Sequence, residues 1–319
     1  MGLTPANGRV AAIIPVFGAR FLAQALESVF FQSHPPDDVI VVDDGSPDPQ
    51  AVRRAVAPYG DRVRLVRQNN QGAGAARNAG IAATSAGFIA FLDADDRWLP
   101  HFILEQIGTF EAEPELDLVY ADGLYVGHTP LAGRRFMSVC PSDGRVTLES
   151  LVAQQCTVLL SSVVARRDAI LSVGGFDTTL RRGQDFDLWI RMARRGARMQ
   201  YQRKVLTLHR RHEDALSGTP LNQIERPLAV LRKTAATMPL TERERSILQR
   251  RMRALEGDLA RERGKELLRR GEFIEARRAF AEACRDIGAW KTHAARLGLY
   301  VAPHLIRRLY LTRVAISAS

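Results

Sequence analysis

Residues 88–96 read FIAFLDADD, a run of apolar residues that passes directly into three aspartates within four positions. The apolar part, Phe88–Leu92, predicts a strand buried on both faces, because a half-exposed strand would alternate apolar and polar residues. Asp93 and Asp95 are two positions apart, so on an extended chain their carboxylates lie on the same side. Oxygen ligands in this arrangement suit a hard divalent cation, although a solvated acidic turn would have the same sequence.

The sequence before this run repeats the same plan. Apolar stretches at residues 10–16, 39–42 and 63–66 predict three more buried strands, and residues 21–31 and 73–83 have the character of helices. Buried strands that alternate with helices predict an α/β fold, with a mostly parallel sheet and helices on both faces. In such sheets ligands bind at the carboxyl ends of the strands, which is where the aspartates lie.

The rest of the chain changes character along its length. Further elements are expected as strands at residues 116–126 and 156–165 and an amphipathic helix at residues 185–195. From about residue 218 the pattern is helical, so we expect one α/β domain over residues 1–217 and a basic α-helical region over residues 218–319. Residues 271–283 resemble half of a tetratricopeptide hairpin, a unit that is usually stable only in arrays of about three or more.

The positive charge of the protein is confined to this helical region. The chain has 45 Lys and Arg against 35 Asp and Glu, and residues 1–220 contribute 24 of each. Residues 221–319 contribute 21 basic and 11 acidic residues, which accounts for the whole net charge of +10. The residues that follow Asp286 include no acid, and the cations there are Lys291, Arg296, Arg307, Arg308 and Arg313. Such a segment favours a polyanionic surface, either lipid headgroups or nucleic acid.

Apolar residues are interleaved with the last cations. They are Leu297, Leu299, Tyr300, Val301, Leu305, Ile306, Leu309, Tyr310 and Leu311. An amphipathic segment of this kind can lie in the headgroup plane of an anionic membrane. The same residues could instead pack on the first domain or on a second subunit, and Pro303 interrupts the pattern, so both alternatives stay open.

Three features bear on the location of the protein. Residues 1–9 lack the pattern of a signal peptide, and no segment approaches the roughly 20 apolar residues of a spanning helix. Cys140, Cys156 and Cys284 are odd in number and widely spaced, which favours neither disulfides nor a zinc site. We therefore expect a cytoplasmic protein, with the option of peripheral attachment to the inner face of a membrane.

Two further motifs follow the other predicted strands. Asp43 and Asp44 enter a Gly-Ser turn, and adjacent carboxylates are costly to bury unpaired, so they should face donors or a cation unless they cap the next helix. Residues 72–78 (GAGAARN) resemble a dinucleotide fingerprint but lack its third glycine and follow the third strand, so no nicotinamide cofactor is expected. Small residues there would let a helix begin close to a ligand, with Arg77 as its one charge.

Taken together these motifs resemble the family 2 inverting glycosyltransferases, which have the GT-A fold. The matching segments, in order, are 13–16 (IIPV), 41–46 (VVDDGS), 76–80 (ARNAG), 91–96 (FLDADD), 174–177 (GGFD) and 185–189 (DFDLW). The resemblance covers about residues 8–217. It implies an enzyme that transfers a sugar from a nucleotide-sugar, in the first instance a UDP-sugar, to a hydroxyl group of a glycan or a lipid-linked acceptor. Such activity would belong to bacterial polysaccharide or cell-envelope synthesis.

The resemblance also implies where the nucleotide binds. Pro15 and Phe17 would lie beside it, and Asp43 or Asp44 would bond the uracil or the ribose. Arg77 would help to hold the nucleotide, and Asp93 would contact the ribose or a metal ion.

The resemblance also implies which residues bind a metal ion and which residue is the general base. The resemblance implies that Asp95 is the main ligand of Mn²⁺ or Mg²⁺, a cation that would stabilise the departing nucleoside diphosphate. Asp185 matches the general base, although the family usually has Glu-Asp where this chain has Gln184-Asp185. His212, at the end of the segment 209–212 (HRRH), would contact the metal or the diphosphate; a lone surface imidazole is the alternative.

Two other classes of protein fit parts of the sequence. A sugar-phosphate nucleotidyltransferase would share the sheet and the acids, but its basic, glycine-rich loop is missing after the first strand, where residues 16–19 read VFGA. A nucleic-acid-binding protein would explain the charge, but aromatic residues for base stacking are sparse in the basic region. We therefore expect a sugar donor and an acceptor as partners, and no nucleic acid.

Overall fold

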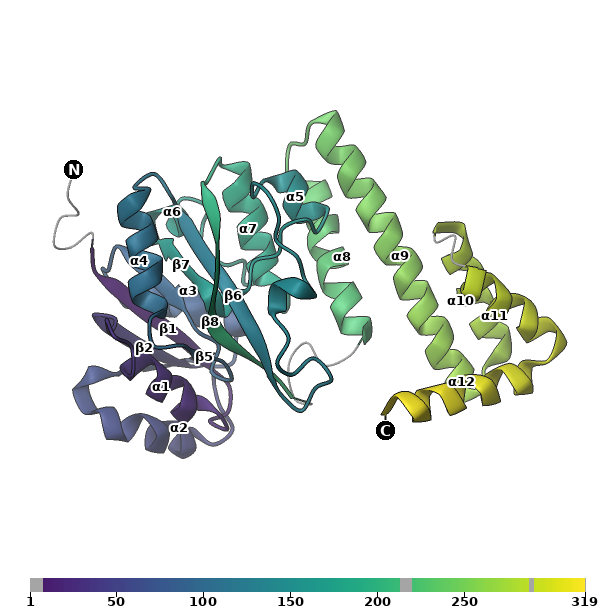
Figure 1. The fold of residues 1–319 in the computed structure, drawn as a ribbon, viewed down its shortest axis with the longest axis horizontal. Coiled ribbons are helices and arrows are strands. Elements are labelled where there is room, and N and C mark those ends of the chain that lie inside the picture. Colours follow the sequence, from purple (N-terminus) through teal and green to yellow (C-terminus); the bar gives the residue numbers. More distant parts are fainter. Residues whose placement is uncertain (1–7, 213–219, 287–289, 319) are drawn as a thin grey trace. The chain divides into compact units, whose positions relative to one another are not determined.

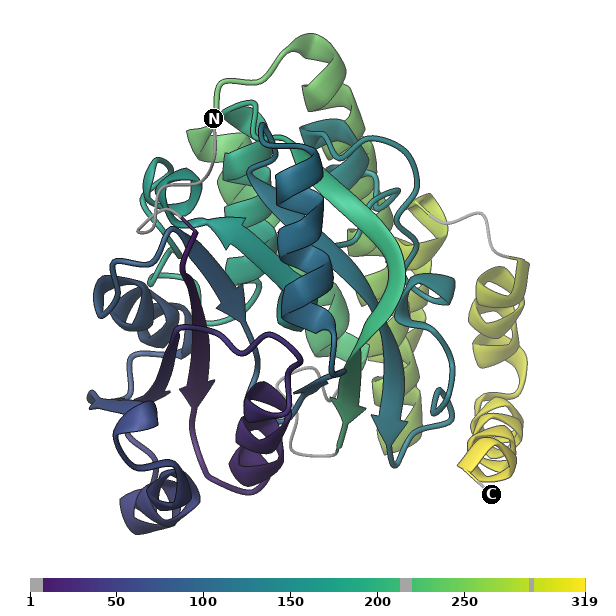
Figure 2. The same cartoon turned by 60° about the vertical axis from the view of Figure 1, so that its left-hand side comes forward.

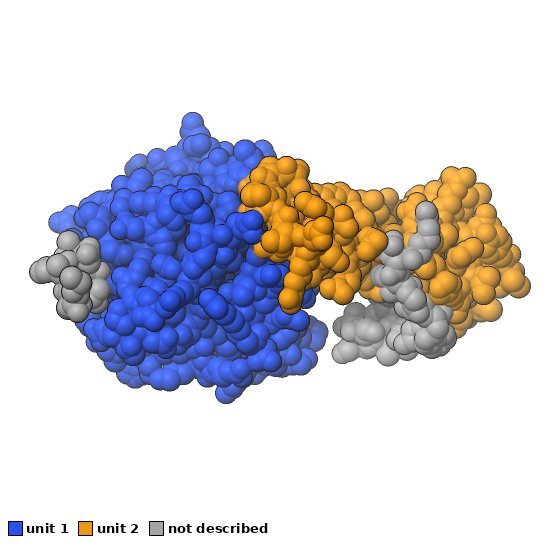
Figure 3. All heavy atoms as spheres, turned by 90° about the horizontal axis from the view of Figure 1, so that it is seen from above, with its two compact units in different colours: residues 1–215 blue, residues 216–319 orange. Residues whose placement is uncertain are grey.

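The computed structural model describes residues 8–212, 220–286 and 290–318, and the chain divides into two compact units, residues 1–215 and 216–319 (Figure 3). The first unit holds an eight-stranded sheet (Figures 1 and 2). Its strands are β1 (Val10–Val16), β2 (Asp38–Asp43), β3 (Arg64–Arg67), β4 (Phe88–Phe91), β5 (Arg97–Trp98), β6 (Leu118–Gly127), β7 (Val163–Arg166) and β8 (Met199–Arg211). Its α-helices are α1 (Leu22–Phe30), α2 (Pro49–Val56), α3 (Ala73–Ala82), α4 (Phe102–Ala112), α5 (Leu148–Val152), α6 (Arg167–Leu171) and α7 (Gln184–Arg194).

The strand order, β3-β2-β1-β4-β7-β6-β8-β5, separates a parallel half from a mixed half. Strands β3, β2, β1 and β4 run parallel, whereas β7 is antiparallel to both β4 and β6. Strand β8 then pairs parallel with β6 and antiparallel with β5. The expected α/β fold is confirmed, and the sheet is more mixed than its first four strands suggested.

Helices cover both faces of this sheet, so β1 is buried along its whole length. On one face Ile14 belongs to an apolar core that also contains Leu26 of α1 and Phe110 of α4. On the other face Ile13 meets α3 at Gly80, where an added Cβ would lie 2.5 Å from Ile13 Cγ2. Gly80 therefore lets α3 lie very close to the sheet, which fixes the position of the residues that α3 carries.

In the middle of the chain one expected strand is shorter than predicted, and one strand was not predicted at all. Only Val163–Arg166 of the strand expected at residues 156–165 is a strand, because Leu160–Ser162 form a 3-10 turn. The carbonyls of that turn are taken by side chains: Trp98 Nε1 donates to Ser161 O and Gln106 Nε2 donates to Ser162 O, both at 2.8 Å. Strand β8 was not expected, because its polar residues do not alternate with apolar ones; its outer neighbour is the two-residue strand β5, which leaves much of it accessible.

The described part of the second unit is helical. Its helices are α8 (Pro220–Thr237), α9 (Glu242–Arg270), α10 (Phe273–Asp286), α11 (Trp290–Val301) and α12 (Pro303–Ala318). Helix α9 ends at Gly271, whose φ of +85° is the left-handed conformation of a helix C-cap, and α10 turns back along it. Gly264 makes room for Phe280, since a Cβ there would lie 2.9 Å from that ring. The domain boundary expected at 217/218 falls within residues 213–219, outside the described residues.

None of the helices within residues 8–212, 220–286 and 290–318 is both long enough and apolar enough to cross a bilayer.

Candidate active site

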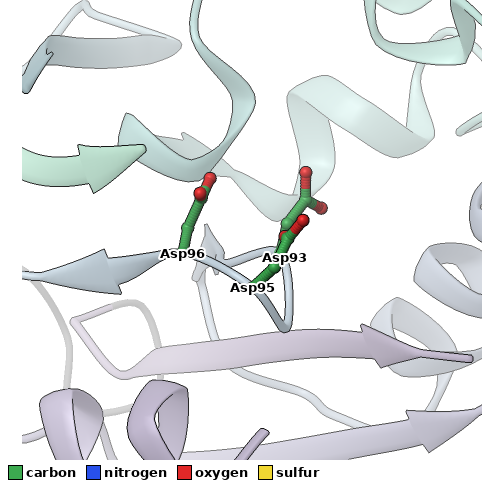
Figure 4. Close-up of side chains that lie close together, drawn as sticks. All are labelled: Asp93, Asp95 and Asp96. Atoms are coloured by element: carbon green, nitrogen blue, oxygen red, sulfur yellow. The ribbon is translucent and has the colours of Figure 1, made fainter. Parts of the chain in front are cut away.

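The aspartates that follow β4 form a compact cluster at the carboxyl edge of the sheet. Asp93, Asp95 and Asp96 each offer a carboxylate oxygen, and these oxygens all lie within 4.8 Å of one another. Asp93 and Asp95 project side by side from the turn, while Asp96 projects from its far end, just before β5 (Figure 4). The turn is closed by a hydrogen bond of 3.0 Å from Asp96 N to Asp93 O. The sequence therefore places three negative charges in the volume of a single ion site.

The crowding of these carboxylates has its largest effect on the pKa of Asp95. Burial raises the pKa of its carboxyl group, and the neighbouring carboxylates of Asp96 and Asp93 raise it further, to about 6. His212 opposes the shift through its Nε2, which lies 3.0 Å from Asp95 Oδ2. The buried Nδ1 of His212 has no hydrogen-bond partner among the described residues. Crowded carboxylate oxygens beside an imidazole with an unused nitrogen are a donor set that fits a divalent cation.

Asp96 has a role that the sequence analysis did not assign. Its side chain is 1% exposed and accepts hydrogen bonds from Arg210 N at 2.7 Å and from His209 Nδ1 at 3.1 Å. Arg210 also donates from Nε to Asp95 O at 3.0 Å. These bonds fasten the end of β8 to the turn after β4, and so bring His212 to Asp95. In the sequence, this role could have been suspected only from the third aspartate of the cluster and the first histidine of the segment HRRH.

Arg77 of α3 contacts the cluster at Asp93. It is only 6% exposed, and its Nη2 donates to Asp93 Oδ1 at 2.6 Å. Its guanidinium also sits 5.4 Å from the ring centroid of Phe176. Asp93 is further oriented by Ser161, whose Oγ accepts from Asp93 N at 3.1 Å, a contact that only the tertiary structure reveals. This places a buried positive charge directly beside the aspartate cluster.

Asp43 and Asp44 organise the loops beside the cluster. Asp44 is 4% exposed and accepts from Gln71 N at 2.9 Å, Gly72 N at 2.8 Å and Gln68 Nε2 at 2.8 Å. Because Gly72 is the N-cap residue of α3, Asp44 fixes the start of that helix. Asp43 accepts from Ser46 N at 2.8 Å and pairs with Arg67. The structure thus gives both carboxylates internal partners, and contact of either with a nucleotide stays a prediction.

Pro15 and Phe17, the other residues expected beside a nucleotide, lie at the end of β1. Pro15 is buried in β1 opposite Val42 of β2, so it can shape the site only through the backbone around it. Phe17 follows directly and is 58% exposed. The loops after β1 and β2 are tied by a bond of 2.9 Å from Gly18 N to Ser46 Oγ. An exposed ring held at this edge is suited to stack on a flat base.

Asp185 lies on a helix that packs against α3. It lies in the first turn of α7, next to Gln184, which is buried and packs so closely on α3 that a Cβ at Gly74 would lie 3.1 Å from Gln184 Cγ. The loop before α7 is held by Asn78, which accepts from Phe176 N at 2.9 Å and donates to Phe176 O at 2.8 Å. Helix α3 therefore contacts both the turn that carries Asp93 and the helix that carries Asp185.

Solved structures first place the fold in a class. The S. aureus protein TarS in complex with UDP-GlcNAc superimposes with a TM-score of 0.61, at 17% identity over 87% of this chain and 89% of that chain. A mannosyltransferase from Pyrobaculum calidifontis in complex with GDP-Man and Mn²⁺ gives 0.63, at 20% identity over 97% of this chain and 86% of that chain. The fold is that of the GT-A glycosyltransferases.

Sequence relatives then identify the family. Residues 11–139 match the family described as "Glycosyl transferase family 2". The chain is similar to an uncharacterized glycosyltransferase of Rickettsia prowazekii, with 28% identity over 228 residues, 68% of each chain. It is 33% identical over 214 residues to the pre-mycofactocin glycosyltransferase of Mycobacterium tuberculosis, which is 64% of this chain and 43% of that protein. These matches support a family 2 glycosyltransferase of GT-A type over the first unit, as its motifs predicted, and the protein is a transferase enzyme.

Proposed function

We propose that the first unit transfers a sugar from a nucleoside diphosphate sugar, in the first instance a UDP-sugar, to an acceptor hydroxyl with inversion at the anomeric carbon. The observation that carries this proposal is the cluster of Asp93, Asp95 and Asp96 at the carboxyl edge of the sheet, with Arg77 on one side and His212 on the other. The family supports it, as do the two structural neighbours, which are complexes with UDP-GlcNAc and with GDP-Man and Mn²⁺.

Residues of the cluster would hold a divalent cation, Mn²⁺ or Mg²⁺. Asp95, Asp93 and His212 would be its ligands, whereas the oxygens of Asp96 are engaged with His209 and Arg210. When bound, the cation supplies positive charge to the diphosphate of the donor. Arg77 adds a second positive charge beside Asp93 and orients the same diphosphate.

The nucleoside would lie over the ends of β1 and β2. Phe17 offers its exposed ring to the base, and the loop that Asp43 and Asp44 hold in place offers polar groups to the base and ribose. The buried Pro15, opposite Val42 of β2, would shape the backbone of β1 beside the nucleoside. These residues bind and orient the donor.

Asp185 would act as the general base. Inversion requires the acceptor hydroxyl to attack the face of the sugar opposite the leaving diphosphate, so the base must stand apart from the metal cluster. The position of Asp185 on α7, a separate element that packs on the start of α3, supports this role. Its carboxylate would take the hydroxyl proton as the new glycosidic bond forms.

The acceptor is proposed to be a glycan or a lipid-linked molecule. The polysaccharide of a bacterial cell envelope is a product of this kind, and a lipid-linked acceptor would be presented at the inner face of the membrane. The net charge of +10 on the second unit supports a peripheral position at that anionic surface.

Calorimetry of UDP binding tests the proposal. Asp93, Asp95 and His212 leave the shell of a six-coordinate ion incomplete, and diphosphate oxygens would complete it. We expect UDP to bind at least about tenfold more tightly with Mn²⁺ than in EDTA, and Mn²⁺ to bind more tightly with UDP by the same factor, because such coupling is reciprocal. GDP and dTDP in the same titrations show which base is preferred. Equal affinity of every nucleotide with and without metal would contradict the proposal.

A further inference from the structure

The last two helices of the second unit divide their apolar side chains between the interior and the surface. Leu299 of α11 is 4% exposed and packs with Leu268 and Phe280, and Ile306 and Tyr310 of α12 join this cluster. The other six of the nine apolar residues noted in the sequence are 37–87% exposed: Leu297, Tyr300 and Val301 on α11, and Leu305, Leu309 and Leu311 on α12. The interior of the unit therefore accounts for only three of the nine apolar residues noted in the sequence.

The exposed residues recur at helical spacing. Leu297, Tyr300 and Val301 are three to four positions apart on α11, and Leu305 and Leu309 are four apart on α12, so each set lies on one side of its helix. The two helices are packed closely, because a Cβ at Gly298 would lie 2.6 Å from Ile306 Cδ1. Single apolar residues scattered over a surface need no explanation, whereas apolar residues gathered on one side of a helix indicate an interaction surface.

The unit that carries these residues has a net positive charge. The sequence after Asp286 contains no acidic residue, and residues 216–319 carry 21 basic and 11 acidic residues, a net charge of +10. Arg308 is exposed between Leu305 and Leu309, and the guanidinium of Arg277 lies 4.0 Å from the ring centroid of Tyr300. A second copy of this unit would meet it with the same charge, whereas an anionic lipid surface offers both negative charge and an apolar interior.

We propose that α11 and α12 dock on an anionic lipid membrane. Leu297, Tyr300, Val301, Leu305 and Leu309 enter the boundary between headgroups and acyl chains, and Arg308 lies among the lipid phosphates with its stem along the leucines. Ile306 and Tyr310 meanwhile keep α12 attached to the rest of the unit. This docking does not depend on the donor site, so it can be tested without a sugar nucleotide.

Vesicle co-sedimentation of the full chain is the test. Vesicles of phosphatidylcholine with phosphatidylglycerol should bind the protein at low salt, and vesicles of phosphatidylcholine alone should bind it much more weakly. The variant Leu305→Asp/Leu309→Asp should lower the partition coefficient at least about tenfold, since it removes apolar contact and adds two negative charges. The matched control is Leu104→Asp/Leu171→Asp, which changes two exposed leucines of α4 and α6 by the same charge and should bind like the wild type. Thermal melts check that both variants are folded.

Several results would overturn the proposal. One is a full chain that ignores anionic vesicles at low salt, and another is equal binding by the two double variants. A dimer in sedimentation that Leu305→Asp/Leu309→Asp dissolves, without vesicle binding, would assign the face to a second copy. Retention of an oligonucleotide without vesicle binding would assign the cations to nucleic acid.

Discussion

Replacing Asp95 by Asn is expected to lower metal-dependent sugar transfer by about 10³-fold or more. Asp95 is proposed as the main ligand of the cation that offsets the charge of the departing diphosphate, which is worth several kcal/mol, and each 1.4 kcal/mol is a factor of ten in rate. The measurement is initial rate of donor turnover as a function of Mn²⁺ concentration, for the wild type and Asp95→Asn.

The same variant should not be destabilised, which separates loss of metal from loss of fold. Because the pKa of Asp95 is raised to about 6, its ionised form opposes folding, and this penalty grows as the pH rises through 6. Asn carries no charge, so metal-free Asp95→Asn should melt at the same or a higher temperature than the wild type at pH 7.5. Asp61→Asn, at an exposed carboxylate, is the control and should leave rate and metal dependence unchanged. A full rate in Asp95→Asn would exclude Asp95 as the main metal ligand.

Replacing Asp185 by Asn should give the second large effect, a loss of about 10²–10⁴-fold in transfer with nearly unchanged nucleotide and metal affinity. The reason is that Asp185 is proposed to take the acceptor proton and to make no contact with the diphosphate. Calorimetry with UDP and Mn²⁺, beside transfer assays, measures the two quantities separately.

A matched control for this variant is available on another helix. Asp168 lies in the first turn of α6, as Asp185 lies in the first turn of α7, and Asp168 is exposed. Asp168→Asn removes the same favourable charge from a helix N-terminus, so it reports the structural part of the effect. If Asp185→Asn turns over like Asp168→Asn, another group is the base.

The parallel half of the sheet was readable from the sequence because its pattern is local. The strands expected at 10–16, 39–42, 63–66 and 88–92 lie within one residue of β1–β4 at each end. A strand buried on both faces needs an unbroken apolar run, and such runs are recognisable without knowing the partner strand. The order of the motifs along the chain then gave the resemblance to the family 2 glycosyltransferases.

The remaining features depend on contacts between distant segments. Asp96 meets Arg210 across 114 positions, and Asp93 meets Ser161 across 68, so a local motif can contain such residues but cannot pair them. Strand β8 has neither an apolar run nor an alternating pattern, and its place follows from pairing with β6. On α12 the sequence could not separate Ile306, which packs inside, from Leu305, which is exposed, because both are apolar and adjacent.

The anomeric configuration of the released sugar tests the central claim most directly. Proton NMR can follow turnover of α-linked UDP-, GDP- and dTDP-sugars with Mn²⁺, with water or a simple sugar as acceptor. The account predicts that at least one donor yields the β-configured product first, that EDTA stops the reaction, and that Asp95→Asn and Asp185→Asn both suppress it. Release of the α-configured product, or turnover that persists in EDTA, would contradict an inverting transfer through the Asp93–Asp95 site.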